Sequence, residues 1–317
     1  MRVGSVLWIV TGAAAALVVV AREGGAEPPL PRAHPVLREG DTQGQLTPAS
    51  VRSPAPEAPV VRAKRTFTAT GCSDDMVRVA GRFCIDRYEA SMVDDDTERP
   101  LSPYYPPLPS TMRTIFVEWT QRLADGHAGA NMPLPALADW QREQSFRPRA
   151  ISRPNVVPHG YLNAIVAGKA CASAGKRLCT QEEWTTACRG ERDTKFPYGA
   201  TYRANVCNVF RQSHPGMILH GNFSLDLLDP RMNVVTSEGE PLLRATGATI
   251  GCKSQWGDDA VYDMVGNLDE WIEDQGGTFM GGFYARSTRQ GCDAKVTAHR
   301  PNYLDYSTGV RCCDALR

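Results

Sequence analysis

The stretch VYDMVGNLDEWIED, residues 261–274, gathers oxygen-bearing side chains around one glycine. Asp263, Asn267, Asp269 and Glu270 all lie within four residues of Gly266. Hard cations prefer several oxygen ligands, and a tight glycine turn aims backbone carbonyls toward its centre. Taken alone, a solvated acidic turn is the simpler explanation. Both interpretations stay open on the residues themselves.

Two upstream segments, 162–174 and 180–189, have helical patterns. Thr180 with Glu183 three residues later matches a capping box, and Gly175 stands where a helix C-cap glycine is expected. These features favour packing and capping over chemistry. Nearer the N-terminus, residues 76–91 read as two short strands joined in a hairpin.

The segment between the hairpin and these helices, 99–154, is rich in proline and irregular, with one helical candidate at 114–124. After Gly199 the chain becomes rich in loops, with short strand signals near 260–264 and 279–284. Long loops around a few short elements predict an α+β fold with little regular secondary structure.

Four segments, in this order, resemble motifs of the formylglycine-generating enzyme (sulfatase-modifying factor) family. They are FCIDRYEAS at 83–91, AGKACASAGKRLCTQEEWTTACRG at 167–190, FPYGATYRANVCN at 196–208, and VYDMVGNLDEWIED at 261–274 with GGFYA and GVRCC after it. The resemblance spans residues 66–317. It implies one compact, disulfide-braced domain of the type related to C-type lectins.

The resemblance also implies a structural Ca²⁺ ion in the 261–274 stretch. The matching ligands are the side chains of Asp263 and Glu270 and the backbone carbonyls of Gly266 and Leu268.

A second calcium site of the family would begin at Asn205 and Val206. Its later ligands fall where this chain carries an insertion, at about residues 209–248, so they cannot be placed. The sequence also departs from the family pattern at Asp269, where a tryptophan is usual.

The family's oxidases convert a cysteine in a Cys-x-Pro-x-Arg motif of a sulfatase to formylglycine, using oxygen, Cu⁺ and two neighbouring thiols. The matching stretch here is GGFYARSTRQGC, 281–292. Arg286 takes the place of the first thiol, and Cys292 matches the second only if one residue is inserted. Soft thiolates bind Cu⁺ well, but a lone thiol cannot supply two of them. Cys292 is therefore a weak catalytic candidate, and Cu⁺ is expected only if the oxidase interpretation holds.

The ten cysteines all follow the N-terminal apolar segment. Their even number and the absence of CxxC spacing favour disulfides over metal binding. Cys72 and Cys84 flank the first hairpin strand and are expected to tie it to the preceding chain. We expect Cys292 to pair with Cys312 or Cys313.

Residues 1–26 have the pattern of a secretory signal peptide, with an uncleaved N-terminal membrane tether as the alternative. Residues 27–65 are rich in proline and alanine and predict a disordered linker. Residues 66–317 form the predicted domain. We therefore expect an extracytoplasmic protein, which is secreted, periplasmic or anchored facing outward.

The 35 basic and 35 acidic residues balance, which argues against a nucleic-acid partner. Arg286, His299 and Arg300 are candidates for a groove that binds an anionic ligand, although a structural histidine is the commoner case. Three classes of function remain. We favour a ligand-binding or accessory family member whose ligand is an unknown peptide, protein or glycan. The alternatives are an oxygen-dependent oxidoreductase of the formylglycine-generating type and a structural envelope protein.

Overall fold

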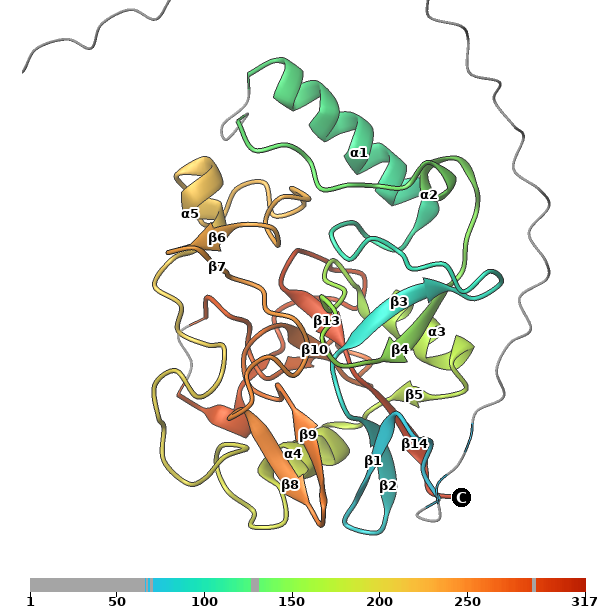
Figure 1. The fold of residues 1–317 in the computed structure, drawn as a ribbon, viewed down its shortest axis with the longest axis vertical. Coiled ribbons are helices and arrows are strands. Elements are labelled where there is room, and N and C mark those ends of the chain that lie inside the picture. Colours follow the sequence, from blue (N-terminus) through green and yellow to red (C-terminus); the bar gives the residue numbers. More distant parts are fainter. Residues whose placement is uncertain (1–65, 67, 69–70, 127–130, 287–288) are drawn as a thin grey trace, which may run out of the picture. The chain divides into compact units, whose positions relative to one another are not determined.

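The computed structural model describes residues 66, 68, 71–126, 131–286 and 289–317 (Figure 1). The predicted leader and linker lie outside these residues. Within the described part of the chain, no helix has both the length and the apolar character needed to cross a membrane.

The predicted N-terminal hairpin is confirmed and belongs to a four-stranded sheet. Its strand order is β1-β2-β14-β5, with β1 Met76–Val79, β2 Phe83–Asp86, β14 Cys312–Ala315 and β5 Arg177–Leu178. Ala80 and Gly81 both have positive φ (50° and 67°) and turn the chain between β1 and β2. The last strand of the chain thus pairs between the first hairpin and the segment before α4.

A second four-stranded sheet carries the residues of the motif-rich stretch. Its order is β12-β11-β10-β13, with β12 Lys295–Val296, β11 Phe279–Met280, β10 Asp269–Trp271 and β13 Thr308–Val310. Strand β10 runs parallel to β13, and all three of its residues are buried. A side chain on β10 therefore faces either the core or an enclosed site.

Three two-stranded sheets complete the strands of the described residues. They are β3 Ala90–Asp94 with β4 Pro148–Ser152, β6 Thr236–Ser237 with β7 Glu240–Pro241, and β8 Lys253–Trp256 with β9 Asp259–Tyr262. Short elements and long connections give the α+β fold that the sequence predicts.

The helices are α1 Pro109–Ala124, α2 Asp139–Glu143, α3 Ala164–Ser173, α4 Gln181–Arg189 and α5 Pro215–His220, with a 3₁₀ turn at Gly291–Asp293. The capping box of Thr180 and Glu183 is present at the start of α4. Helix α1 begins five residues earlier than predicted, because proline is tolerated in the first turn of a helix. In Figure 1, α1 lies along the upper edge, far from the β1–β2 hairpin.

All ten cysteines lie among the described residues and form five disulfides: Cys72–Cys84, Cys171–Cys312, Cys179–Cys313, Cys188–Cys292 and Cys207–Cys252. The predicted Cys72–Cys84 bridge is confirmed.

The predicted pairing of Cys292 with Cys312 or Cys313 is wrong. Those two adjacent cysteines lie on β14, which pairs with β5, and this brings them to Cys171 and Cys179. Cys292 instead meets Cys188 near the end of α4.

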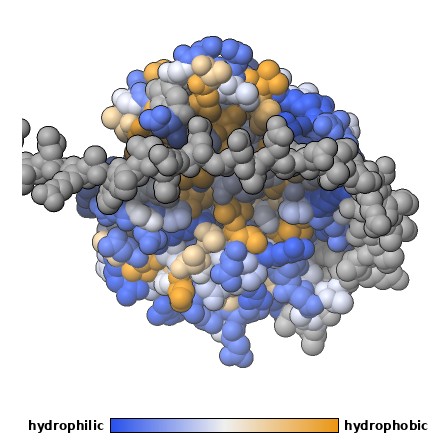
Figure 2. Space-filling view, turned by 45° about the horizontal axis from the view of Figure 1, so that its top comes forward, coloured by the Kyte–Doolittle hydropathy of each residue, from blue (hydrophilic) through white to orange (hydrophobic). Residues whose placement is uncertain are grey.

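Polar and apolar residues alternate in patches over the face shown in Figure 2. Several large apolar side chains are exposed, and many of them lie in the insertion that contains α5: Met217, Ile218, Phe223, Leu225 and Leu228. The core, by contrast, is built around Trp184 and Trp271, which are both fully buried.

Candidate functional site

The second motif segment and the fourth, with its GVRCC end, meet at Glu270 on β10. Nε of Arg311 donates to both of its carboxylate oxygens, at 3.2 and 3.1 Å, and Nη2 donates to Oε1 at 2.9 Å. Nε1 of Trp184 donates to Oε2 at 2.7 Å. The side chains of Glu270 and Arg311 are at most 1% exposed. Because a buried charge is tolerated only when it is paired and hydrogen-bonded, this network explains how Glu270 and Arg311 are accommodated in the core.

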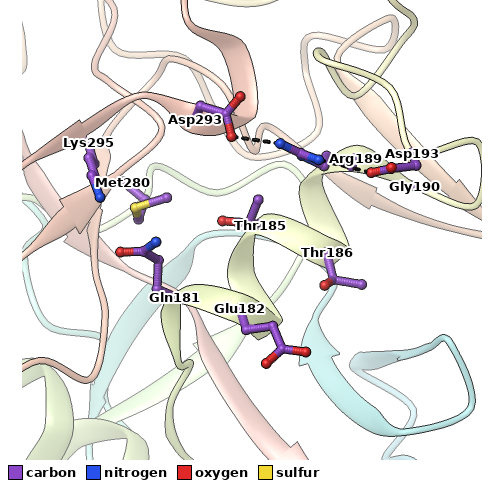
Figure 3. A pocket seen from close by; sticks show the side chains of 10 residues that line it. All are labelled: Gln181, Glu182, Thr185, Thr186, Arg189, Gly190, Asp193, Met280, Asp293 and Lys295. Atoms are coloured by element: carbon purple, nitrogen blue, oxygen red, sulfur yellow. Dashed lines mark hydrogen bonds and ion pairs between the residues drawn. The ribbon is translucent and has the colours of Figure 1, made fainter.

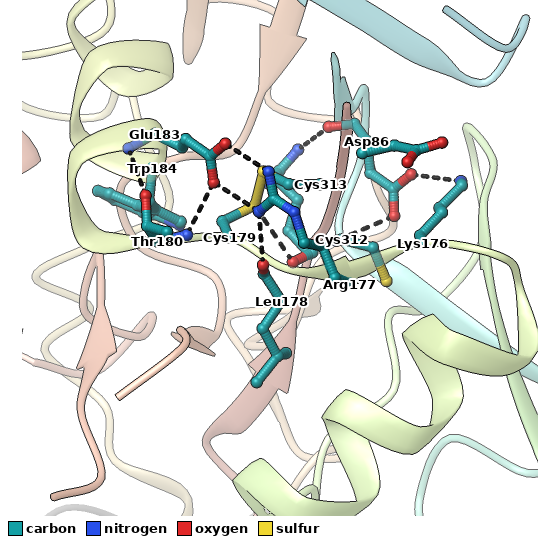
Figure 4. Close-up of a disulfide and its surroundings, with 12 residues drawn as sticks. Asp86, Lys176, Arg177, Leu178, Cys179, Thr180, Glu183, Trp184, Cys312 and Cys313 are labelled. Carbon is teal, nitrogen blue, oxygen red and sulfur yellow. Dashed lines mark hydrogen bonds and ion pairs between the residues drawn. A yellow bond between two sulfur atoms is a disulfide. The ribbon is translucent and has the colours of Figure 1, made fainter. Parts of the chain in front are cut away.

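A second buried ion pair joins the first and second motif segments (Figure 4). Nζ of Lys176 lies 2.5 Å from Oδ1 of Asp86 and also binds Asp75. The other oxygen of Asp86 accepts from the backbone N–H of Cys312, at 3.0 Å. Lys176 and Asp86 thereby fix the start of β14 beside the disulfides, which is a structural role.

Three buried carboxylates, Glu89, Asp263 and Glu270, influence one another electrostatically around Arg311. Glu89 accepts from the side chain of Asn267 at 2.6 Å and from the backbone of Leu268 at 3.0 Å. Burial, with repulsion from Asp263 and Glu270, raises the pKa of Glu89 well above its usual value. Burial also raises the pKa of Asp263 to about 6. Three acids thus surround the guanidinium of Arg311, and Arg244 also acts on Asp263.

The residues predicted to bind calcium fit the ion only in part. Each oxygen of Glu270 already accepts from two donors, so this carboxylate does not fit as a ligand in this arrangement. One oxygen of Asp263 accepts from the backbone of Gly247, at 2.7 Å. Asp263 and the carbonyls of Gly266 and Leu268 are the hard oxygen donors that calcium takes. No group of three or more His, Cys, Asp or Glu side chains is placed to hold a metal ion within the described ranges.

The structure adds little support for the second predicted calcium site. Asn205 is exposed, and Val206 beside it is half-buried. Asn205 lines a cavity of about 270 Å³ together with Arg211 and Glu238. Its function as a calcium ligand stays a prediction.

The two departures from the family pattern, Arg286 and Asp269, contact each other. Nη1 of Arg286 donates to Oδ1 of Asp269 at 2.9 Å, and Nη2 lies 2.8 Å from Oδ2. The Asp269 side chain is fully buried, while that of Arg286 is 29% exposed. Burial raises the pKa of Asp269 to about 7, although Arg286 lowers it. The place predicted for the first thiol therefore holds a cation paired to an acid on β10.

Aromatic rings surround this pair. The guanidinium carbon of Arg286 lies 5.3 Å from the ring centroid of Phe283 and 5.8 Å from that of Phe279. His299 stacks on Phe279, with centroids 5.7 Å apart, and on Tyr303, with centroids 3.8 Å apart. Arg286 and His299 therefore both contact the ring of Phe279, and a ligand groove at these residues stays a prediction. Arg300 follows His299 in the chain and is exposed.

The surface continues toward the insertion through His214. This histidine lies edge-on to Phe283 and to Phe223, with centroids 6.2 and 6.1 Å apart, and contacts the Tyr306 hydroxyl through Nε2, at 2.9 Å. Phe223 is 64% exposed. Two groups of rings, Tyr303–His299–Phe279 and Phe283–His214–Phe223, are thus linked by Arg286, which contacts Phe279 and Phe283.

Cys292, the candidate for the second thiol, is fully buried and bonded to Cys188. Beside this disulfide lies a cavity of about 610 Å³, lined by polar side chains of α4, by Arg189 and Asp293, and by Met280 and Lys295 of β11 and β12 (Figure 3). Arg189 bonds to Asp293 at 2.9 Å, next to each cysteine of the bridge. The Arg189–Asp293 ion pair thus flanks the disulfide, and the bonded sulfur of Cys292 is not a thiolate.

Sequence reasoning missed two contributors to these sites. Glu89 lies in the first motif segment, and this position in the sequence was the signal that could have identified it. The pairing of Arg286 with Asp269 had a signal too, because both positions break the family pattern and carry opposite charges.

Comparison with known proteins assigns the chain to a family. A family model for the sulfatase-modifying factor enzyme 1-like domain matches residues 136–316. The formylglycine-generating enzyme of Bos taurus is 31% identical over 139 residues, which cover 43% of this chain and 32% of that protein. The chain therefore matches about a third of the length of this curated relative.

The solved structures that match the chain share less of its sequence. PvdO from Pseudomonas aeruginosa is 16% identical, with 74% of this chain and 80% of that chain covered and a TM-score of 0.36. The U1 variant of the major tropism determinant is 15% identical, with 78% and 54% covered and a TM-score of 0.35. The family model matches more than half of this chain. The chain therefore belongs to the family of sulfatase-modifying factor enzyme 1-like domains.

Proposed function

We propose that this chain is an exported, ligand-binding member of its family that has lost the thiol–copper oxidase chemistry. One observation carries the proposal: Arg286, paired to Asp269, stands at the first thiol position, and Cys292 is closed in a disulfide with Cys188. Copper(I) prefers soft thiolate ligands. All ten cysteines of the sequence are bonded in pairs, so none is available to bind it.

Export is supported by the same five disulfides. Disulfides persist in oxidising compartments and are rare in the cytosol. The N-terminal apolar pattern points the same way.

Copper(I) titration of the oxidised protein tests the loss of thiol chemistry, with an authentic formylglycine-generating enzyme as positive control. We expect no stoichiometric binding by this chain. Cys188→Ser and Cys292→Ser form a matched pair, because both break the same bridge but only the first leaves the Cys292 thiol. Stoichiometric binding by the wild type, lost in Cys292→Ser and kept in Cys188→Ser, would overturn the proposal.

The ligand site that we propose is the surface of Arg286, His299 and Arg300 with its aromatic rings. The half-buried rings of His299 and Tyr303 and the partly exposed guanidinium of Arg286 supply contact area and donors at low conformational cost, as in many protein interfaces. The ligand class is a peptide, protein or glycan.

A displayed peptide library and a glycan array, each probed with the purified protein, test this site. We expect ligands whose binding drops at least tenfold on Arg286→Ala or Tyr303→Ala, since interface anchors of this kind often contribute more than about 1.4 kcal/mol. Arg82→Ala, at an exposed residue paired with Glu182, is the control. Retained ligands that are insensitive to both site variants would refute the assignment.

We retain a structural calcium ion as a second proposal. Its support is the excess of buried negative charge, since Glu89, Asp263 and Glu270 share the guanidinium of Arg311, with Arg244 as a further cation acting on Asp263. A divalent cation held by Asp263 and neighbouring carbonyls would offset that excess. Protonation of Glu89 is the competing way to neutralise it.

A further inference from the structure

A groove separate from the Arg286 surface runs along α3. It has a volume of about 780 Å³ and is lined by residues of α3, by its N-cap Asn163, by Leu108 and by the start of β4. Ligand cavities in proteins commonly measure about 300–1,000 Å³. Helix α3 has ten residues and is therefore about 15 Å long, and residues from its N-cap Asn163 to Ser173 line the groove.

The walls of this groove are mostly apolar. Leu108 and Pro148 are half-buried on one side, and Val166 is buried on the other. Ile165 is 50% exposed, and Ala172, two turns further along α3, is exposed as well. Burial of apolar surface stabilises a protein or complex by about 25 cal/mol for each Å² removed from water, and these side chains lack that stabilisation while they face water. An apolar occupant would recover it.

The groove also has one available cation. Arg147 is engaged by Asp95, at 3.4 Å, and by Asp96, at 2.5 Å. Asp95 is further held by Arg149, at 3.3 Å.

Lys169 lies on the exposed stripe of α3, one turn after Ile165 and one turn before Ala172. The structure gives its ammonium group no ion pair or hydrogen bond with any other described residue. Asn163, by contrast, is occupied as the helix cap through its bond from Val166. The lining therefore has two cations and one acid, and Lys169 is the cation without a partner inside the described part of the fold.

We propose that this groove binds a small amphipathic carboxylate, with its aliphatic body along Leu108, Pro148 and Ile165 and its carboxylate on Lys169. An aliphatic chain fits the long apolar walls, and a single negative charge matches the single available ammonium. Hydrogen bonds to charged groups are stronger than those between neutral groups, so the carboxylate adds to affinity and fixes orientation. The site uses none of the residues of the proposed Arg286 surface.

Isothermal titration of the oxidised full chain with decanoate, below its micelle concentration, tests the proposal. Decanol and decylammonium serve as neutral and cationic probes of the same chain length. We expect saturable one-to-one binding of decanoate, with decanol at least about tenfold weaker and decylammonium undetectable.

Exposed positions allow variants that do not disturb the core. Lys169→Gln should weaken decanoate about tenfold, to the level of decanol. Lys169→Glu should exchange the preference in favour of decylammonium, and Ile165→Asn should weaken decanoate and decanol together. Lys295→Gln, an exposed lysine in the cavity beside α4, is the matched control and should change nothing. Non-saturable binding, equal binding of decanol, or an effect of Lys295→Gln as large as that of Lys169→Gln would overturn the proposal.

Discussion

Arg286 and Asp269 form an ion pair through both carboxylate oxygens, at 2.9 and 2.8 Å, with the acid fully buried on β10. Both positions depart from the pattern of the family that the sequence resembles. An acid on β10 without the cation would be an uncompensated buried charge, and such charges are strongly destabilising. The two residues therefore depend on each other, and together they put an ion pair at the place predicted for the first thiol.

The pH dependence of stability tests this mutual dependence. Asp269 has a raised pKa, so the folded state holds its proton more tightly than the unfolded state, and stability falls as pH rises from about 4 to about 7. Removing the cation in Arg286→Ala raises that pKa further and extends the fall to higher pH. We expect the loss relative to wild type to reach about 3 kcal/mol at pH 8 and to be smaller at pH 5.

Urea unfolding at pH 5 and pH 8, without reductant, measures these differences. The decline in stability between the two pH values should be steepest for Arg286→Ala, intermediate for the wild type and shallowest for Arg286→Ala with Asp269→Asn. Arg82→Ala removes the cation of an exposed pair and should cost less than about 1 kcal/mol at either pH. Equal declines in all four proteins would show that Arg286 and Asp269 are not coupled.

Thiol counting tests the disulfide pattern. Alkylation of the exported protein in denaturant without reductant should modify no cysteine, because all ten are paired. Cys188→Ser should gain one reactive thiol, which peptide mapping should place at Cys292. A reactive thiol at Cys312 or Cys313 in that variant would contradict the pairing.

The same bridge should matter for stability. Cys188–Cys292 closes 104 residues of chain, whereas Cys72–Cys84 closes only 12. On the chain-entropy model, losing the longer loop costs about 1–2 kcal/mol more than losing the shorter one. Urea unfolding of Cys188→Ser and Cys72→Ser measures the difference, and a larger loss for Cys72→Ser would count against that explanation.

Calcium addition tests how the carboxylates around Arg311 are neutralised. If a cation offsets Glu89 and Asp263, millimolar calcium raises the Tm of the metal-depleted wild type by mass action. Asp263→Asn should abolish that rise, while Asp139→Asn, at an exposed residue of α2, should keep it. No response of the wild type at pH 8, where protonation is least favourable, would remove calcium from the account.

The parts of the fold that follow from local rules were predictable from the sequence. The capping box of Thr180 and Glu183 and the hairpin at 76–91 depend on neighbouring residues, and both were predicted. The start of α1 was missed by five residues because a helix can begin at a proline whose missing N–H needs no partner.

The pairings between distant residues could not be predicted in the same way. Cys292 lies 104 residues from its partner, and only the packing of α4 against the 3₁₀ turn brings the two together. The contact of Arg286 with Asp269 likewise depends on how the chain after β11 returns over β10. Local sequence patterns do not indicate which distant residues come into contact, although the broken family motif at both positions was a clue.

The central claim is that this family member lacks thiol–copper oxidation, and one measurement tests it most directly. A Cys-x-Pro-x-Arg peptide is incubated in air with the copper-treated protein, beside an authentic formylglycine-generating enzyme, and its mass is followed. We predict that the peptide thiol stays unconverted while the control enzyme turns it into the aldehyde. Conversion by this chain, at a rate that depends on Cys292, would contradict the account.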